Sequence, residues 1–357
     1  MTGLTSLAID PCAGAAPVGN ANLTAICLAQ GATAAQIGLI ANPSAAQANA
    51  TGGGNPLIRP EKADTLTFGV VLRPSEIIPG LSVTVDYYDV KVNNAITSAT
   101  SSDIIQACFG TITAASATSA ACTGIRRNAG NGRLSGTSTA ANPILGLPQP
   151  LTNNGRLATD GIDFKVNYRR EFGNVGFTYD LNGNWVNHSK FQASPTGINR
   201  ECVGYFSPNC SSQNGAIQPR WTWTQRTTLS FGDVDVSLLW RHLSGVVYEG
   251  QAADFAARGF TATSRNLFNG TITGPSPLAG RTVNLNRIPA YDYFDLSTRF
   301  QITKELQLTL TAFNITNKAP PLVGSGAGST AQNSGNTFPS TYDPIGRRFA
   351  ATVNVRF

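Results

Sequence analysis

Charged residues, histidine and long apolar runs are scarce in this sequence of 357 residues. Asp, Glu, Lys and Arg make up only 13% of it, about half of the share that is usual for soluble proteins. There are two histidines and one methionine. No stretch approaches the roughly 18 consecutive apolar residues of a membrane helix. The composition therefore fits neither a strongly charged disordered chain nor a leucine-rich helical protein.

Motifs for catalysis, metal binding and nucleic-acid binding are also missing. The sequence has no Gly-x-Ser-x-Gly elbow, no His-Glu-x-x-His pair and no phosphate loop. Its formal charge is +6, but no basic run is longer than the pairs at 126–127, 169–170 and 347–348. We therefore predict a protein that is not an enzyme, with no catalytic residue, no cofactor, no metal site and no nucleic-acid partner.

The six cysteines fall into three local pairs, each of which brackets a stretch rich in small residues. None has the Cys-x-x-Cys spacing of a zinc or redox site. An even number of locally paired cysteines favours disulfides and an oxidising compartment. The predicted disulfides are Cys12–Cys27, Cys108–Cys122 and Cys202–Cys210; the alternative is six unpaired buried thiols.

What the sequence does contain is alternation of apolar and polar residues, clearest at the carboxyl end. In 349–357, Phe349, Val353 and Phe357 share one face of a strand, whereas Thr352 and Arg356 share the other. This two-residue period is that of a β-strand. A strand with one apolar and one polar face fits a wall between lipid and water. It also fits a half-buried strand in a soluble sandwich.

The same alternation recurs in about nine segments, most of 10 to 14 residues. Strands of that length exceed the usual five or six residues of soluble proteins and suffice to cross a bilayer at a tilt. Short and long connections alternate, which is typical of outer-membrane barrels. We therefore predict an all-β, antiparallel transmembrane β-barrel wall with strands at 64–73, 81–92, 157–170, 175–187, 220–231, 234–243, 291–300, 306–317 and 349–357.

The connections also predict an orientation. The last strand ends on the side of the short turns, so that side should be periplasmic and the long loops extracellular. Residues 1–60 should form an extracellular loop segment, with one short helix around 34–40, and residues 61–357 the barrel portion. All three cysteine pairs then lie outside the cell.

Several segments resemble the carboxyl-terminal part of TonB-dependent outer-membrane receptors. The residues that carry the resemblance are NPLIRPEKAD at 55–64, GLSVTVDYYDV at 80–90, TDGID at 159–163, AFNITNK at 312–318 and YDPIGRRF at 342–349. The terminal Phe357 is similar to the family's barrel-assembly signal. The resemblance covers residues 55–357 and follows the family order.

The resemblance implies a larger barrel of about 22 strands, with a signal peptide, a TonB-contacting segment and a plug domain that this chain lacks. We therefore expect a fragment, whether a truncated gene or one part of a split receptor. The expected location is the bacterial outer membrane. The expected partners are membrane lipid, the barrel-assembly machinery, a small-molecule nutrient, and TonB through the missing amino-terminal part only.

The implied function is energised uptake of a scarce nutrient, such as a siderophore, a cobalamin-like molecule or an oligosaccharide. Aromatic and Arg side chains in the loops suit such ligands, although each could instead pack the loops together. The candidate ligand contacts are Arg126, Arg127, Tyr205, Phe206, Tyr248, Phe255, Arg258, Phe260 and Arg265. The residues expected to face the lumen are Asp163, Lys165, Asn167, Arg169, Asp180, Arg226, Asp235, Arg241, Asp295 and Arg299.

A different class of function also fits the sequence. A secreted, disulfide-containing β-protein could act as an adhesin or another surface-binding module. Such a protein should be soluble without detergent, whereas a barrel wall should partition into detergent and migrate in a heat-dependent way on gels.

Overall fold

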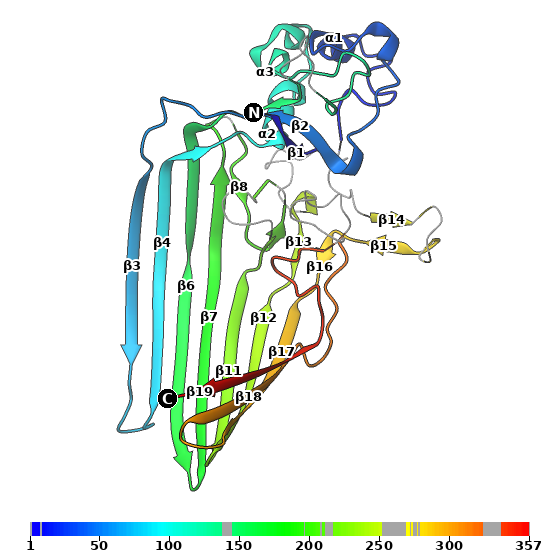
Figure 1. Cartoon of the computed structure of the whole chain (residues 1–357). Coiled ribbons are helices and arrows are strands. Elements are labelled where there is room, and N and C mark those ends of the chain that lie inside the picture. The colour runs from blue at the N-terminus through cyan, green and yellow to red at the C-terminus, as the bar shows by residue number, and fades with distance from the viewer. Residues whose placement is uncertain are drawn as a thin grey trace.

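The structure is a computed structural model in which one curved sheet is the dominant feature (Figure 1). It describes residues 2–7, 9–137, 145–195, 197–207, 209–210, 217–251, 269–271, 273, 277, 279–323 and 337–356. No helix in these ranges is long and apolar enough to cross a membrane.

The sheet consists of long antiparallel strands in the order β19-β18-β17-β12-β11-β7-β6-β4-β3, with the short β8 (Arg200–Glu201) paired to β7. The predicted all-β wall and its nine long strands are confirmed. Within the described residues, β3 and β19 are the two edges of the sheet. The strands are β3 (Lys62–Leu72), β4 (Leu81–Thr97), β6 (Thr152–Phe172), β7 (Val175–Gln192), β11 (Trp221–Phe231), β12 (Val234–Leu243), β17 (Tyr291–Gln301), β18 (Leu306–Phe313) and β19 (Arg348–Val355).

The ends of four strands differ from the prediction for two identifiable reasons. Strands β4, β6 and β7 extend further toward the long loops, where β6 pairs with both neighbours beyond the alternating segment. Strand β18 ends four residues early because Asn314 takes a left-handed conformation, with φ of 49°. The Asn314 side chain then accepts a hydrogen bond from the backbone N–H of Lys318 at 2.8 Å, which closes a turn instead of continuing the strand.

Strand register divides the sheet into an apolar and a polar face. On the apolar face, Phe68 of β3 is 69% exposed, Leu296 of β17 38% and Phe349 of β19 77%. No second sheet of described residues packs against this face, as it would in a soluble sandwich. A large exposed apolar surface marks a membrane or protein contact.

All ten residues expected to face the lumen share the polar face, according to the strand register. Several of them pair across strands: Asn167 with Asp180, Asp235 with Arg299, and Arg241 with Asp295. That this face lines an aqueous lumen remains a prediction.

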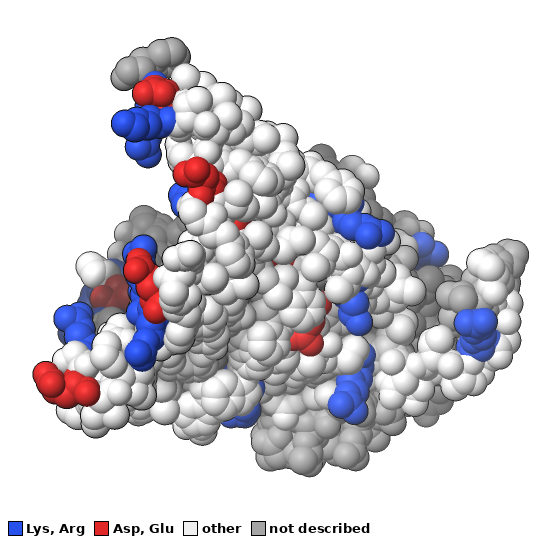
Figure 2. Space-filling view, turned by 90° about the horizontal axis from the view of Figure 1, so that it is seen from below, with Lys and Arg blue, Asp and Glu red and all other residues white. Residues whose placement is uncertain are grey.

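Short and long connections lie at opposite ends of the sheet (Figure 1). The tightest turns use Gly173 and Gly232, whose φ angles of 60° and 59° favour glycine. Viewed from the turn end, Lys, Arg, Asp and Glu side chains form small separate groups on a mostly uncharged surface (Figure 2).

Beyond the long-loop end lies a compact unit, here called the exterior module, formed by the described parts of residues 2–60 and 98–150 (Figure 1). Its cores pack α1 and β2 against α2 and α3. Its elements are β1 (Thr2–Ser6), α1 (Ala21–Ala29), η1 (Ala34–Gln36), η2 (Ser44–Ala46), β2 (Gln47–Thr51), α2 (Ser101–Phe109), η3 (Ala114–Thr118), α3 (Ala120–Thr123) and β5 (Leu147–Pro148).

The helices of the exterior module differ from the prediction. Only a single 3₁₀ turn, η1, lies in the segment 34–40, whereas α1 and α2 lie in regions read as irregular loop. Helix α1 has apolar residues on all sides, so its sequence shows no helical period. It begins at Asn20, whose side chain caps the backbone N–H of Leu23 at 3.0 Å, and Leu23 and Ile26 are buried by tertiary packing.

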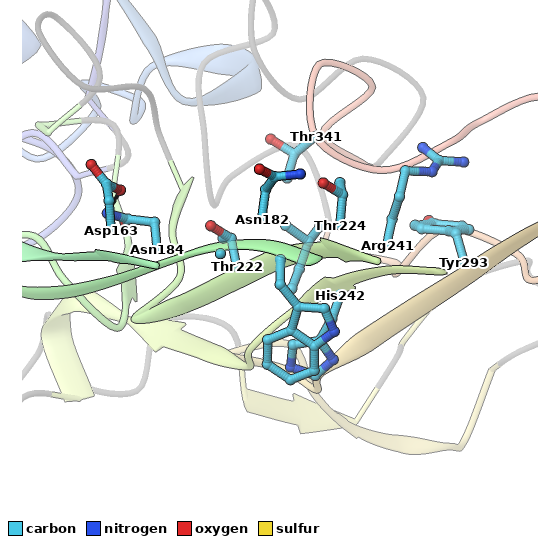
Figure 3. Close-up of a pocket in the computed structure, with 12 residues that line it drawn as sticks. Asp163, Asn182, Asn184, Thr222, Thr224, Arg241, His242, Tyr293 and Thr341 are labelled. Carbon is cyan, nitrogen blue, oxygen red and sulfur yellow. Dashed lines mark hydrogen bonds between the residues drawn. The ribbon is translucent and has the colours of Figure 1, made fainter. Parts of the chain in front are cut away.

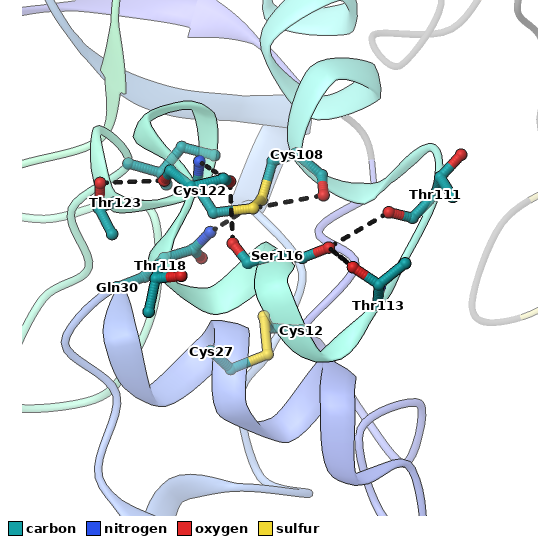
Figure 4. Close-up of a disulfide and its surroundings, with 12 residues drawn as sticks. Cys12, Cys27, Gln30, Cys108, Thr111, Thr113, Ser116, Thr118, Cys122 and Thr123 are labelled. Atoms are coloured by element: carbon teal, nitrogen blue, oxygen red, sulfur yellow. Dashed lines mark hydrogen bonds between the residues drawn. A yellow bond between two sulfur atoms is a disulfide. The ribbon is translucent and has the colours of Figure 1, made fainter.

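All three predicted disulfides are present. Two of them lie close together in the exterior module, Cys12–Cys27 against α1 and Cys108–Cys122 between α2 and α3 (Figure 4). Gln30 Nε2 approaches Cys108 Sγ at 3.5 Å and thereby links the two halves of the module. The third, Cys202–Cys210, closes a loop beside β7 and packs on Phe191.

Smaller strands form the remaining loops between the module and the sheet. Strands β9, β10, β13 and β16 make one small sheet, and β14 pairs with β15. The first of these sheets packs on the ends of the long strands through an apolar core that contains Phe206, Tyr291 and Phe338. The bounds are β9 (Tyr205–Phe206), β10 (Ile217–Gln218), β13 (Val246–Tyr248), η4 (Glu249–Gln251), β14 (Asn269–Thr271), β15 (Thr282–Asn284) and β16 (Arg287–Ile288).

The segment that leads into β19 is a hydrogen-bonded turn centred on Asp343. Its carboxylate accepts hydrogen bonds from the backbone N–H of Ile345 at 3.0 Å and from Arg348 at 2.7 Å. Gly346 has φ of +82°, and a Cβ there would meet Asn317 Oδ1 at 3.0 Å. Burial raises the pKa of Asp343, but the hydrogen bonds from Arg348 and Ile345 outweigh it and hold that pKa below its usual range.

We expect Asp343→Asn to lower the free energy of unfolding by about 1–2 kcal/mol at pH 7, the range of a hydrogen bond to a charged group on a partly exposed partner. A carboxyl whose pKa is lower in the folded state stabilises the fold above its unfolded pKa of about 3.9, and this contribution is lost as the pH falls below that value. Thermal melting in detergent at pH 7 and pH 3 measures the difference. The stability difference between Asp343→Asn and the wild type should be smaller at pH 3 than at pH 7. Glu305→Gln, at an exposed position, is the control. An equal loss of stability at both pH values would contradict the stabilising role of the ionised Asp343.

Candidate functional site

A pocket of about 420 Å³ lies on the sheet near its long-loop end. Most of its side chains project from the polar face, and His242 lies on the opposite side of the sheet (Figure 3). Because neighbouring strands are in register, residues far apart in the sequence meet here. The lining consists of Asp163, Asn182, Gly183, Asn184, Thr222, Trp223, Thr224, Arg241, His242, Leu243, Tyr293 and Thr341.

One end of the pocket is an amide and carboxylate pair. Asn184 of β7 lies opposite Asp163 of β6 in the register and donates a hydrogen bond to its Oδ1 at 2.8 Å. The same amide donates to the hydroxyl of Tyr88 on β4 at 3.1 Å. This arrangement fixes the amide and leaves the carboxylate of Asp163 facing the pocket.

The other end is organised by Arg241 of β12. Its guanidinium forms an ion pair with Asp295 at 3.2 Å and lies 5.3 Å from the centre of the Tyr293 ring. Asp295 also accepts a hydrogen bond from the backbone N–H of Asn314 at 2.8 Å. The Tyr293 hydroxyl accepts one from the backbone N–H of Asp343 at 3.2 Å. The charge of Arg241 is therefore matched by a neighbouring carboxylate.

The polar groups of the pocket are mainly amides, hydroxyls and one carboxylate, and Trp223, Leu243 and Tyr293 add apolar surface. Arg241 is the one Lys or Arg among its lining residues, and its charge is matched. In the part of the chain that the structure describes, no group of three or more His, Cys, Asp or Glu side chains is placed to hold a metal. The pocket is thus equipped to exchange hydrogen bonds with a polar ligand.

The loops around the pocket are tied together by a buried ionic cluster. Arg200 of β8 bonds both oxygens of Asp103 of α2, at 2.8 and 3.2 Å, and lies 3.5 Å from Glu249 of η4. Glu249 in turn accepts a hydrogen bond from Ser207. Three loops from different parts of the chain therefore converge on one arginine.

The residues nominated for ligand contact occupy different environments. Arg127 is fully buried, with bonds to Asp10, Gln30 and the carbonyl of Gly132, and Phe206 is fully buried in the loop core. Because neither offers surface to a ligand, we remove both from the ligand-contact proposal.

Arg126, Tyr205 and Tyr248 are half-buried and stay in the proposal. Burial raises the pKa of Tyr248, and the charge of Glu249 adds to that effect. Phe255, Arg258, Phe260 and Arg265 lie outside the described residues, as does the predicted assembly signal Phe357.

Sequence reasoning nominated Asp163 and Arg241 for the polar face but missed several other lining residues. Asn182, Asn184 and Thr224 alternate with apolar neighbours, so the two-residue period already placed them on this face. Tyr293 and Thr341 carried no such signal. Tyr293 is one of several aromatic residues near the end of a strand. Thr341 lies in a loop, and its position over the sheet depends on the tertiary structure.

Several solved structures of receptors and transporters align with this chain. The ferric enterobactin receptor of Pseudomonas aeruginosa, in complex with enterobactin, aligns at 13% identity with a TM-score of 0.50, over 87% of this chain and 33% of that one. The siderophore receptor PirA of Acinetobacter baumannii aligns at 13% with a TM-score of 0.47, over 87% and 34%. The FrpB iron transporter of Neisseria meningitidis aligns at 13% with a TM-score of 0.45, over 86% and 33%.

At these identities the likeness concerns the fold, and this chain spans about a third of the length of each receptor. No curated protein sequence matches the chain. The family model described as TonB dependent receptor-like, beta-barrel matches residues 28–317. That match covers most of the sequence and includes every long strand except β19, so the chain belongs to the TonB-dependent receptor β-barrel family.

Proposed function

We propose that this chain forms part of the wall and exterior loops of a bacterial outer-membrane receptor that takes up a small nutrient. One observation carries the proposal: a sheet of long strands, apolar on one face, has on its other face a polar pocket beneath disulfide-bonded loops. Energised transport would need a plug and contact with TonB, which we assign to segments outside this chain. The lumen-facing role of the polar side chains belongs to the same proposal.

Within the nutrient class, the pocket favours an uncharged, hydroxyl-rich ligand such as an oligosaccharide over an anionic ferric chelate. Asp163 faces the pocket without a matching cation among the lining residues, and Arg241 is neutralised by Asp295. In the exterior module, Asp10 is the only charged side chain among residues 1–58, and it is buried against Arg127. The other segment adds Arg126 and the exposed Arg133, but neither is among the residues that line the pocket. Attraction of an anion would need unmatched positive charge.

The adhesin alternative has weaker support. A secreted module would need its apolar face covered, but Phe68 and Phe349 of the two edge strands are among the most exposed apolar residues. Cell fractionation separates the two functions. A receptor wall should be found in the outer-membrane fraction, and a secreted adhesin in the soluble fraction.

The test of the nutrient role is uptake by cells that carry the complete receptor. We expect Asn182→Leu with Thr224→Val to reduce uptake of a neutral oligosaccharide at least about fivefold, because each lost hydrogen bond in a desolvated site is worth about 0.5–1.5 kcal/mol. Uptake of radiolabelled oligosaccharides of different lengths, measured beside ferric catecholate and ferric hydroxamate chelates, provides the readout.

Thr309→Val is the matched control, because Thr309 lies on the polar face opposite Arg299, nearer the turn end, and is not among the pocket residues. Its uptake should equal that of the wild type. Uptake of a ferric chelate, lowered by the same double variant, would support the receptor but overturn the choice of ligand. Unchanged uptake of every compound would contradict the pocket itself.

A further inference from the structure

The apolar face carries a belt of aromatic rings at the long-loop end of the wall. Trp221 lies 6.1 Å from Trp185 and 6.2 Å from Phe164, measured between ring centres. Farther along the belt, Trp240 stacks with Phe294 at 6.0 Å. These residues come from β6, β7, β11, β12 and β17, so the belt crosses five strands at about one height.

A carboxylate lies within this belt, on the face that is otherwise apolar. Asp292 of β17 is opposite His242 in the register. Its Oδ1 accepts hydrogen bonds from Trp240 Nε1 at 2.7 Å and pairs with His242 Nδ1 at 2.7 Å. His242 in turn stacks on Trp223 with ring centres 3.7 Å apart. Two donors therefore hold Asp292 in one orientation.

The second oxygen of Asp292 remains available. Among the described residues, no side chain or backbone group bonds Oδ2, and the Asp292 side chain is 41% exposed, against 14% for His242. An ionisable side chain on the lipid-facing surface is costly at the bilayer centre and much less so near the headgroups. The contacts with Trp240 and His242 stabilise the carboxylate at Oδ1, and the positive charge of Lys318 also favours its ionised form.

The aromatic belt places this cluster near the headgroup level. From Val234 at the turn end to His242, β12 extends about 26 Å along the strand at about 3.3 Å per residue, which a strand tilt of about 40° reduces to about 20 Å of height, within an apolar band roughly 25 Å tall. Aromatic residues at that level lie at the membrane–water interface. With the long loops outside the cell, the interface is that of the outer leaflet.

The chemistry of the cluster selects among headgroups. A carboxylate accepts strong, charge-assisted hydrogen bonds from hydroxyl groups, and it repels a phosphate. The half-buried rings of Trp223 and Trp240 beside it offer apolar surface to the C–H groups of a sugar. A hydroxyl-bearing sugar therefore fits both parts of the cluster, whereas the phosphate of a phospholipid does not.

We propose that Asp292, His242, Trp240 and Trp223 form a site on the outer wall that binds the sugar headgroup of an outer-leaflet glycolipid, with Asp292 Oδ2 accepting a hydrogen bond from a sugar hydroxyl. The site lies on the face opposite the nutrient pocket and is separate from it. The inference rests on the proposed outer-membrane location.

The test measures lipid that remains bound to the protein after mild extraction from outer membranes, by native mass spectrometry, and the affinity for vesicles of an uncharged, phosphate-free glycosyl diacylglycerol and for phosphatidylglycerol vesicles. We expect bound glycolipid on the wild type and an affinity about tenfold lower for Asp292→Asn. Trp240→Phe, which keeps a ring but removes the Nε1–H, should show a smaller loss. Asp233→Asn, which removes a carboxylate at the turn end, should bind like the wild type.

Heat-dependent gel migration checks that each variant is folded, and the folded fraction is the sample that is measured. Equal glycolipid affinity of folded Asp292→Asn and wild type would overturn the site. So would equal binding of phosphatidylglycerol and the uncharged glycolipid, or an equal loss in Asp233→Asn. Absence of the wild type from the outer membrane would overturn the proposed function and this inference together, whereas its presence without glycolipid overturns the inference alone.

Discussion

Arg127→Ala is expected to destabilise the exterior module by about 3–5 kcal/mol, because it leaves the carboxylate of Asp10 buried without its cation. Both side chains have no exposed surface, and the guanidinium bonds Asp10 at 2.6 and 2.8 Å. The pair joins residue 10 to residue 127, so it connects the two segments of the module. Limited proteolysis of the native protein in detergent, followed over temperature, measures the loss.

The double variant Asp10→Leu with Arg127→Met distinguishes a missing charge partner from missing volume. Replacing both members of a buried ion pair with apolar residues removes the uncompensated charge, so the double variant should recover part of the protease resistance. The recovery is incomplete because Gln30, Gly132 and Cys12 lose hydrogen bonds to the pair. Arg133→Ala, at an exposed position of the same module, is the single-charge control. If the double variant were as sensitive as Arg127→Ala, the effect would stem from packing and not from the uncompensated carboxylate.

Arg200→Ala should have an even larger effect on the loops around the pocket. Arg200 has no exposed surface, Asp103 is 4% exposed and Glu249 1%, so the substitution leaves two buried carboxylates without their shared cation. Since breaking one buried pair costs about 3–5 kcal/mol, we expect at least that loss. Hydrogen exchange should become faster in α2, β8 and η4 together, because these segments converge on Arg200.

Two controls make this expectation specific. Arg200→Lys retains the charge but not the two-pronged bond to Asp103, so its effect should be intermediate. Exchange in the wall strands β11 and β12 should remain as in the wild type, because their backbone bonds do not depend on the cluster. Faster hydrogen exchange in β8 alone would show that Arg200 stabilises its own strand and not α2 and η4.

Strand existence, register face and turn positions followed directly from the sequence. Strand β12 matches its predicted bounds, and the others differ mainly where they run into the loops. A β-sheet wall with lipid on one face and water on the other requires apolar and polar residues to alternate with a two-residue period. Each strand shows this alternation in its own sequence. The disulfides were predictable for a similar reason, since each joins cysteines close in the sequence.

The structure of the exterior loops could not be predicted from local sequence patterns. Helix α1 and the short β2–β5 pairing depend on contacts between segments about 100 residues apart, which no local period records. Two of the residues nominated for ligand contact by their type, Arg127 and Phe206, are buried, and Arg127 is paired with Asp10. The other nominations stay predictions.

The sequence by itself thus determined the wall: where each strand runs, which side chains share a face and which cysteines join. Only the tertiary structure decided the exterior module, the ionic cluster at Arg200 and the pocket between Asp163 and Arg241. The physical reason is the sequence separation of the interactions that determine each part. A strand between lipid and water is specified by its own alternating residues, whereas a loop is shaped by whichever distant side chains compensate its buried charges and cover its apolar groups.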